Sequence, residues 1–201
     1  MAKVFGSWTR AVVPDDVMLP RLFLSFLSPV FGSDDYYAAN VCAAILGMRK
    51  ESRLYKSLVR ERQIAAEAAT FTYDLTKGSD LLVVDVAARP GIRGTQLEHE
   101  VAREIDDLHA NGVTDDDVAR AVTLIQTDYV TAIQSAGERA DRLSMFATYF
   151  GDPALINEQV DRYRAVRASD VNVLVQERLG ENNRASLLYV PRDNQNGTRA
   201  A

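Results

Sequence analysis

The sequence has very few of the residues on which most catalytic sites depend. Its 201 residues include one cysteine, two histidines and one tryptophan. A single thiol excludes an internal disulfide and any metal site built from several cysteine thiolates. Cys42 lies among Val41, Ala43 and Ala44, so we expect a buried and unreactive thiol.

Long apolar runs are also missing. The longest, over residues 36–48, is interrupted by Asn40 and falls short of the roughly 20 residues of a membrane-spanning helix. The segment MAKVFGSWTR contains no apolar stretch of the kind found in signal peptides. We therefore expect a soluble protein without a membrane span, of the cytoplasm or the periplasm.

Basic residues are fewer than acidic ones, 23 against 28, which gives a net charge of −5. General binding of nucleic acid requires a basic surface, so this balance disfavours it. A quarter of the residues are charged and 47% are hydrophobic, as is typical of a globular domain.

Hydrophobic periodicity predicts a two-layer α+β fold with about four mostly antiparallel strands and helices packed on one face. Strands are expected over residues 19–28, 63–74, 80–89 and 184–190, with the TKGSD turn joining the second and third in an antiparallel hairpin. Helices are expected over residues 34–47 and 52–62, with five more between residues 97 and 180; Thr114 and Asp117 resemble a capping box for one of them. Residues 1–17 look like a linker or a truncated start, residues 18–191 like a single domain, and residues 192–201 like a disordered tail.

No motif for a metal or a nucleophile is complete. The run His99-Glu100-Val101-Ala102-Arg103 lacks the second histidine of a zinc-binding helix, and it also lacks the Glu-His pair of the inverted motif. His99 and His109 are about ten residues apart, nearly three helical turns, so they cannot both reach one ion. Because there is also no Gly-x-Ser-x-Gly elbow and no phosphate-binding glycine loop, we predict no catalytic residue and no metal ligand in this chain.

The most unusual segment is SRLYKSLVRERQIAAEAATFTY, residues 52–73, in which a basic amphipathic helix leads into a strand. Six cations fall between Arg49 and Arg62, against two acids, Glu51 and Glu61. A solvated helix face with local ion pairs would explain them. The alternative is a surface that contacts a peptide backbone, a substrate carboxylate or an acidic partner, a task that suits the planar fork of arginine.

The first part of this segment, SRLYKSLVRERQIA, closely resembles a stretch of the pitrilysin-like (insulinase-type) zinc metallopeptidases, in the half that carries no metal. LPRLFLSFLSPVFGSDDYYAANVCAAILG and GVTDDDVARAVTLIQTDYV resemble further parts of this family, so the resemblance covers about residues 17–191. It implies a non-catalytic C-terminal half-domain that forms one wall of a peptide-binding chamber and orients the substrate. The zinc would lie in a partner half, and this chain would hold no cofactor and have no activity alone. Its partners would be that zinc-bearing half and a peptide substrate.

The resemblance also implies particular residues. In many members this half offers the bound peptide an arginine and, several residues later, a tyrosine. The arginine position falls on Arg60, and Arg53 and Arg62 are weaker neighbours, so these three are the expected substrate-binding residues. The tyrosine position falls on Ala66 or Glu67, so that contact is absent or altered here.

Other interpretations stay open. Some relatives with this fold are structural or assembly subunits of respiratory complexes and have no peptidase role. A stand-alone enzyme with an unrecognised site is a third possibility. Members also usually begin with a further strand and helix before the segment that VFGSW resembles, which implies either a piece of a longer parent or a compact variant.

Overall fold

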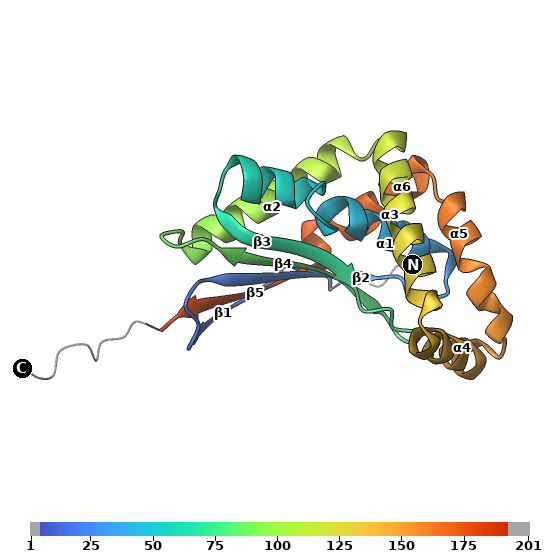
Figure 1. Cartoon of the computed structure of the whole chain (residues 1–201). Coiled ribbons are helices and arrows are strands. Elements are labelled where there is room, and N and C mark those ends of the chain that lie inside the picture. Colours follow the sequence, from blue (N-terminus) through green and yellow to red (C-terminus); the bar gives the residue numbers. More distant parts are fainter. Residues whose placement is uncertain (1–4, 193–201) are drawn as a thin grey trace, which may run out of the picture.

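The computed structural model describes residues 5–192, in which a layer of helices covers one side of a five-stranded sheet (Figure 1). The strand order in the sheet is β1-β5-β2-β4-β3. The strands are β1 (Thr9–Asp15), β2 (Arg21–Ser28), β3 (Ala65–Thr72), β4 (Asp80–Ala88) and β5 (Arg184–Pro191). The longer helices are α1 (Asp34–Gly47), α2 (Gly94–Asn111), α3 (Asp115–Gln134), α4 (Ala136–Phe150), α5 (Gln159–Ala165) and α6 (Ala168–Arg178), and the short ones are η1 (Tyr55–Glu61), η2 (Pro153–Asn157) and η3 (Glu181–Asn183).

The sheet is mostly antiparallel, as expected. β4 pairs antiparallel with both β2 and β3, β2 pairs antiparallel with β5, and β1 alone runs parallel to its neighbour β5. In β2 buried and half-buried residues alternate, because successive side chains of a strand point to opposite faces. Leu22, Leu24 and Phe26 face the helices and are at most 1% exposed. The predicted two-layer fold is therefore confirmed.

β1 corrects two of the expectations. Residues 9–15 form a strand, so the sheet has five strands rather than about four, and these residues are not a linker. The sequence TRAVVPD hid this strand because most of its residues are exposed and show no apolar alternation. Its place is fixed instead by parallel pairing with β5, from Thr9 opposite Ala185 to Asp15 opposite Pro191. The expected disordered tail lies outside the described residues, except for Arg192.

A buried carboxylate also holds β1 in place. Glu98 of α2 is 7% exposed; it accepts hydrogen bonds from Arg10 of β1 and from the hydroxyl of Ser186 in β5, with the Arg10 Nη2 to Glu98 Oε2 distance at 2.8 Å. Burial acts to raise the pKa of Glu98, but the hydrogen bonds from Arg10 and Ser186 outweigh it and leave the pKa lowered. The ion pair therefore links β1, at the edge of the sheet, to α2 in the helix layer.

The helix layer is built around α1. It is buried on nearly every side, as its apolar sequence predicts, and it contacts the sheet on one side and α3 and α6 on others. Where it crosses β3, a Cβ atom on Gly47 would lie 2.2 Å from the backbone nitrogen of Thr70. Only glycine permits this close approach. The predicted capping box of Thr114 and Asp117 is present at the start of α3.

The helix expected over residues 52–62 is present, but it is a π-helix, η1. The Arg62 amide donates to the Ser57 carbonyl oxygen at 2.9 Å, the i→i+5 bond of this rarer form. Arg49 before it and Gln63 after it have left-handed φ angles of 63° and 55°. The segment between α1 and β3 is thus an irregular connection with sharp turns at both ends, a feature that periodicity did not predict.

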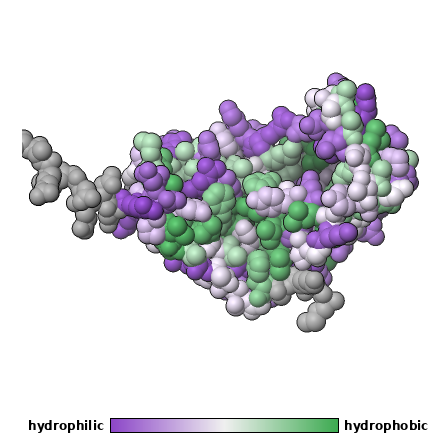
Figure 2. All heavy atoms as spheres, turned by 90° about the horizontal axis from the view of Figure 1, so that it is seen from below, coloured by the Kyte–Doolittle hydropathy of each residue, from purple (hydrophilic) through white to green (hydrophobic). Residues whose placement is uncertain are grey.

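The side of the sheet opposite the helices is open over the described part of the chain. Figure 2 looks onto this side and shows hydrophobic residues gathered over its centre, with polar residues around them. Phe23, Leu81, Leu187 and Tyr189 line a shallow hollow of about 390 Å³ there. Arg21 and Asp85 form an ion pair with an Nη2 to Oδ2 distance of 2.6 Å, and Arg21 also lies over the ring of Phe23.

Candidate functional site

The basic surface predicted from the sequence centres on η1. Arg60, in its last turn, has a side chain that is 56% exposed, and its nearest partner is Glu51, with 3.5 Å from Nη2 to Oε1. Lys56 approaches the other Glu51 oxygen at 3.3 Å. Hydrogen bonding to Lys56 and its charge, followed by the charge of Arg60, lower the pKa of Glu51. Arg60 therefore shares one exposed carboxylate with a second cation, and its guanidinium faces solvent.

Arg62 has a different environment. It donates to two carboxylates of α2, Glu100 and Glu104, with 2.8 Å from Nη2 to the Glu104 oxygen. The Ser57 hydroxyl donates to the same Glu104 oxygen at 2.7 Å. These contacts fasten η1 to α2, so Arg62 has a structural role here.

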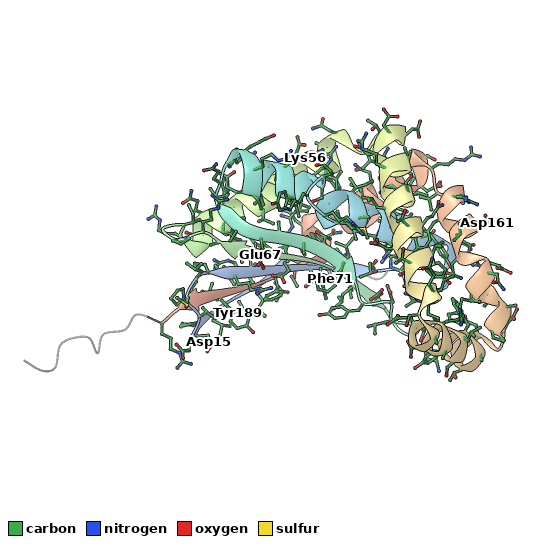
Figure 3. All side chains as sticks on the ribbon, in the orientation of Figure 1. Asp15, Lys56, Glu67, Phe71, Asp161 and Tyr189 are labelled. Atoms are coloured by element: carbon green, nitrogen blue, oxygen red, sulfur yellow. The ribbon has the colours of Figure 1, made fainter. Side chains whose placement is uncertain are left out.

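Arg53 also faces α2. Its Nη2 donates to the Gly112 carbonyl oxygen at 3.1 Å, and its Nη1 lies 3.7 Å from the Asp107 carboxylate. The three predicted residues thus differ in their partners: Arg53 and Arg62 bind α2, and Arg60 does not. Only Arg60 keeps a surface position with one distant partner. Figure 3 shows Lys56, from the same helix, on the opposite side of the sheet from Tyr189.

The position at which the resemblance led us to expect a tyrosine, Ala66 or Glu67, lies at the start of β3. The pairing of β3 with β4 is irregular between Ala65 and Glu67, and both Ala66 and Glu67 are exposed. Figure 3 shows Glu67 on the outer strand of the sheet. Neither side chain carries a phenol hydroxyl. The expected tyrosine is therefore replaced by an exposed residue of another kind.

The histidines and the cysteine are not brought together. His99 and His109 both lie on α2, one exposed and the other half-buried. Within residues 5–192 no group of three or more His, Cys, Asp or Glu side chains is placed to hold a metal ion. Cys42 is completely buried, and that burial raises its pKa to about 12. No helix in the same described range is long and apolar enough to cross a membrane.

A second group of polar residues was missed by the sequence reasoning. A cavity of about 340 Å³ lies beside the end of β3, between that strand and α1, α3, α4 and α5. One wall is a hydrogen-bonded chain: Tyr163 donates to Asn40 at 3.1 Å, Asn40 to Thr72 at 2.9 Å, and Thr72 to Asp74 at 2.8 Å. Tyr36 donates to the same Asp74 oxygen. The one signal in the sequence was Asn40, a polar residue within an otherwise apolar helix.

Burial keeps the two phenols of this wall protonated. Burial raises the pKa of Tyr163 strongly, and it raises that of Tyr36 well above the ordinary tyrosine value. Both phenols therefore stay protonated at neutral pH and donate their hydrogen bonds. The polar wall has a fixed direction, with Asp74 as its final acceptor.

Comparison with known proteins identifies the family. Residues 2–125 match the family model described as the peptidase M16 inactive domain. The chain belongs to the peptidase M16 family. This match confirms the resemblance to the pitrilysin-like zinc peptidases that the sequence motifs indicated, and it confirms that the resemblance is to the inactive domain.

Individual relatives agree with this assignment. An uncharacterised zinc protease of Streptomyces coelicolor is 25% identical over 163 residues, which are 79% of this chain and 34% of that protein. A protease structure from Helicobacter pylori superposes with a TM-score of 0.83 at 19% identity, covering 94% of this chain and 46% of the other. The structure of an inactive peptidase domain from Bordetella parapertussis superposes with a TM-score of 0.78 at 22% identity, covering 91% of this chain and 98% of the other.

The lengths of these relatives matter for function. This chain spans about a third of the Streptomyces protein and about half of the Helicobacter chain. It matches the Bordetella domain over nearly all of both chains. The M16 inactive domain is therefore a unit that occurs within longer proteins.

Proposed function

We propose that this M16 inactive domain is the non-catalytic half of a zinc metallopeptidase, forms one wall of a peptide-binding chamber and orients the substrate for a zinc ion held by a partner half. The observation that carries the proposal is the match of residues 2–125 to the inactive domain of a family whose named relative is a zinc protease. Water activation then belongs to the zinc of the partner half. This chain contributes enclosure and orientation, which can lower a barrier by several kcal/mol without a covalent step.

The open side of the sheet supports a role within a larger assembly. Large apolar patches with polar rims are typical of interaction surfaces, and the hollow around Leu187 and Tyr189 is of this kind. Lys56, in the same helix as Arg60, lies on the opposite side of the sheet in Figure 3. One flat partner cannot cover both surfaces, so we propose that the sheet side attaches the domain while the Arg60 side faces the chamber.

Arg60 is the proposed substrate contact. Its guanidinium is exposed and only loosely paired with Glu51 at 3.5 Å, so a peptide carbonyl or carboxylate can replace that partner at little cost. A hydrogen bond from a charged donor contributes about 1.5–3 kcal/mol. Loss of such a contact in the transition state slows catalysis by about ten-fold or more.

The test is reconstitution. The chain is co-expressed with an M16 half-domain that carries the inverted zinc motif, and cleavage of a quenched fluorescent peptide is followed. We expect Arg60→Ala to lower kcat/KM at least ten-fold without changing the melting temperature. The matched control is Arg164→Ala, a similarly exposed arginine with one local ion pair to Asp161 on α5, which should leave kcat/KM unchanged.

Three results would count against the proposal. Stoichiometric zinc bound by this chain alone, with peptidase activity that a chelator removes, would make it a catalytic unit. Full activity of the Arg60→Ala pair would remove Arg60 from the site. A stable complex with membrane subunits that lack peptidase activity would favour a structural subunit instead.

A further inference from the structure

The cavity beside β3 contains a cation that has no anionic partner. Arg142 of α4 is half-buried, lines this cavity and lies over the ring of Tyr129, with 4.9 Å from its Cζ to the ring centroid. It forms no ion pair with any described residue, and its buried Nε has no hydrogen-bond partner. Arg53 and Arg62, in contrast, both form ion pairs with carboxylates of α2. Because its buried Nε has no partner and its other donors have no acceptor among the described residues, the half-buried guanidinium of Arg142 favours an incoming oxygen ligand.

A second unpartnered group lines the same cavity. The Thr70 side chain, on β3, is 7% exposed, and its Oγ1 has no hydrogen-bond partner. Four buried side-chain atoms of the described chain lack a partner, and two of them, in Thr70 and Arg142, belong to this one cavity. Buried polar groups are normally satisfied. Thr70 and Arg142 both line this cavity of about 340 Å³, and each has an unpartnered polar atom in the cavity wall, which makes the cavity a candidate site for a polar ligand.

The neighbouring charges define which ligand fits. Asp128 on the α3 wall is already paired with Arg49. Asp74 accepts hydroxyl hydrogen bonds from Tyr36 and Thr72 on one oxygen. The cavity therefore offers a guanidinium without an anionic partner, that of Arg142, and a hydrogen-bond acceptor, the carboxylate of Asp74. A peptide presents both complements, a carboxylate or carbonyl oxygen for the guanidinium and a backbone N–H for the acceptor.

β3 gives the peptide a line of approach. It is the last strand of the sheet order, and its outer edge pairs with no other strand in the described chain (Figure 1). Four of its eight residues, at 65, 66, 68 and 69, are alanine, so few bulky side chains flank this edge. An edge that pairs with no strand can accept an extended peptide as an additional strand.

The length of β3 joins this cavity to the proposed substrate contact. Arg60 precedes the start of β3, and Thr70 lies near its end. At about 3.3 Å per residue, the eight residues of β3 span roughly 26 Å. An extended peptide of about eight residues along this edge would thus run from the end of β3 that follows η1, the helix of Arg60, to the end beside the cavity.

We infer that the cavity lined by Arg142 and Thr70 is a peptide-binding subsite, in which a carboxylate of an extended peptide lying along the β3 edge binds the Arg142 guanidinium. This inference rests on the proposed function, because it assigns a peptide substrate to the chain. It adds a specificity-determining residue on α4, a helix that the sequence reasoning left without a role. A carboxyl terminus bound there requires the peptide to run parallel to β3, whereas an acidic side chain permits either direction.

The probe is a fluorescein-labelled ten-residue peptide of alternating Ser and Val whose last residue is varied. One version ends in Gln with a free terminal carboxylate, one in Glu with a terminal amide, and one in Gln with a terminal amide. Binding to the isolated chain is measured by fluorescence anisotropy. We expect at least one of the two acidic peptides to bind at least ten-fold more tightly than the neutral one, and the acidic peptide that gains affinity identifies the source of the carboxylate.

Variants of α4 test the residue itself. Arg142→Gln should weaken the preferred acidic peptide at least ten-fold and leave the neutral peptide unchanged, and Arg142→Lys should recover part of the loss because it keeps the charge. Arg139→Gln, one turn earlier on the same helix and bonded only to the Ile133 carbonyl oxygen, is the matched control and should bind as the unmodified chain does. Melting temperatures of all three variants check the fold, and if Arg142→Gln does not fold, Arg142→Lys carries the comparison.

Amide hydrogen exchange locates the peptide. On binding the acidic peptide, amides of β3 should gain protection. Equal affinity for acidic and neutral peptides, no detectable binding, no effect of Arg142→Gln, or no protection in β3 would each overturn the inference. These results are separate from reconstitution with the zinc-bearing half. Activity that depends on Arg60 but not on Arg142 would leave the proposed function standing without this subsite, and Arg142-dependent binding without a functional pair would do the reverse.

Discussion

The two sides of the sheet differ in how completely the chain covers them. In β2, Leu22 and Leu24 face the helices and are at most 1% exposed, while the alternate residue Phe23 faces the open side and is half-buried. The same alternation in β5 buries Leu188 and leaves Leu187 half-buried. The helices of the described chain therefore complete one core, and the other apolar face is available to a partner.

The largest expected effect is on the covered side. Leu24→Ala should destabilise the chain by about 2–5 kcal/mol, because it removes a fully buried side chain and leaves a cavity. Urea denaturation followed by circular dichroism gives the free energy of unfolding. A loss below about 1 kcal/mol would show that this side is less tightly packed than the structure indicates.

The next effect concerns the carboxylate that joins the helix layer to the edge of the sheet. Glu98→Gln removes the charge that pairs with Arg10 and accepts from Ser186, and should cost about 1–3 kcal/mol at pH 7. Glu138→Gln, an exposed carboxylate on α4, is the control and should cost almost nothing.

The same pair has a defined pH dependence. The pKa of Glu98 is lowered on folding, so its contribution to stability is complete above the unfolded pKa of about 4.3 and is lost as pH falls through the lower folded value. The difference in unfolding free energy between the unmodified chain and Glu98→Gln should therefore shrink below about pH 4. A difference that stayed constant down to pH 3 would mean that the ion pair does not titrate with folding.

The smallest effect is expected on the open side. Leu187→Ala should cost the isolated chain about 1 kcal/mol or less, because Leu187 is only half-buried. In the reconstituted pair the same substitution should weaken association, measured by titration calorimetry. A cost in the isolated chain as large as that of Leu24→Ala would show that a second copy already covers this side in solution, and size-exclusion chromatography would then detect a dimer.

The sequence predicted the parts of the fold that depend on apolar periodicity. The strand over residues 19–28, the β3–β4 hairpin and the buried helix after Ser33 all carry a strong local pattern, and all are present. β1 was missed because its position depends on partners distant in the chain, β5 and Glu98, rather than on its own residues. The π form of η1 was missed because a π-helix is set by backbone strain and packing, not by side-chain period.

The candidate site was predictable only in outline. The cluster of cations from Arg49 to Arg62 was visible in the sequence, but its division was not, because Arg53 and Arg62 find their carboxylates on α2. The roles of Arg53, Arg60 and Arg62 in substrate binding stay predictions. Arg142 gave no signal in the sequence because it becomes unusual only through the absence of an acceptor around it, which is a property of tertiary structure.

The position of β5 has a consequence for how the molecule assembles. β5 comes last among the strands but lies between β1 and β2, so the sheet cannot close until nearly the whole span from Thr9 to Ala185 is available. Contacts so far apart in the chain are slow to form because their loop-closure entropy must be overcome first. During synthesis β2, β3 and β4 can pair before β5 has been made, whereas β1 has no strand to pair with until then. The parallel edge of the sheet is therefore the last part to become ordered.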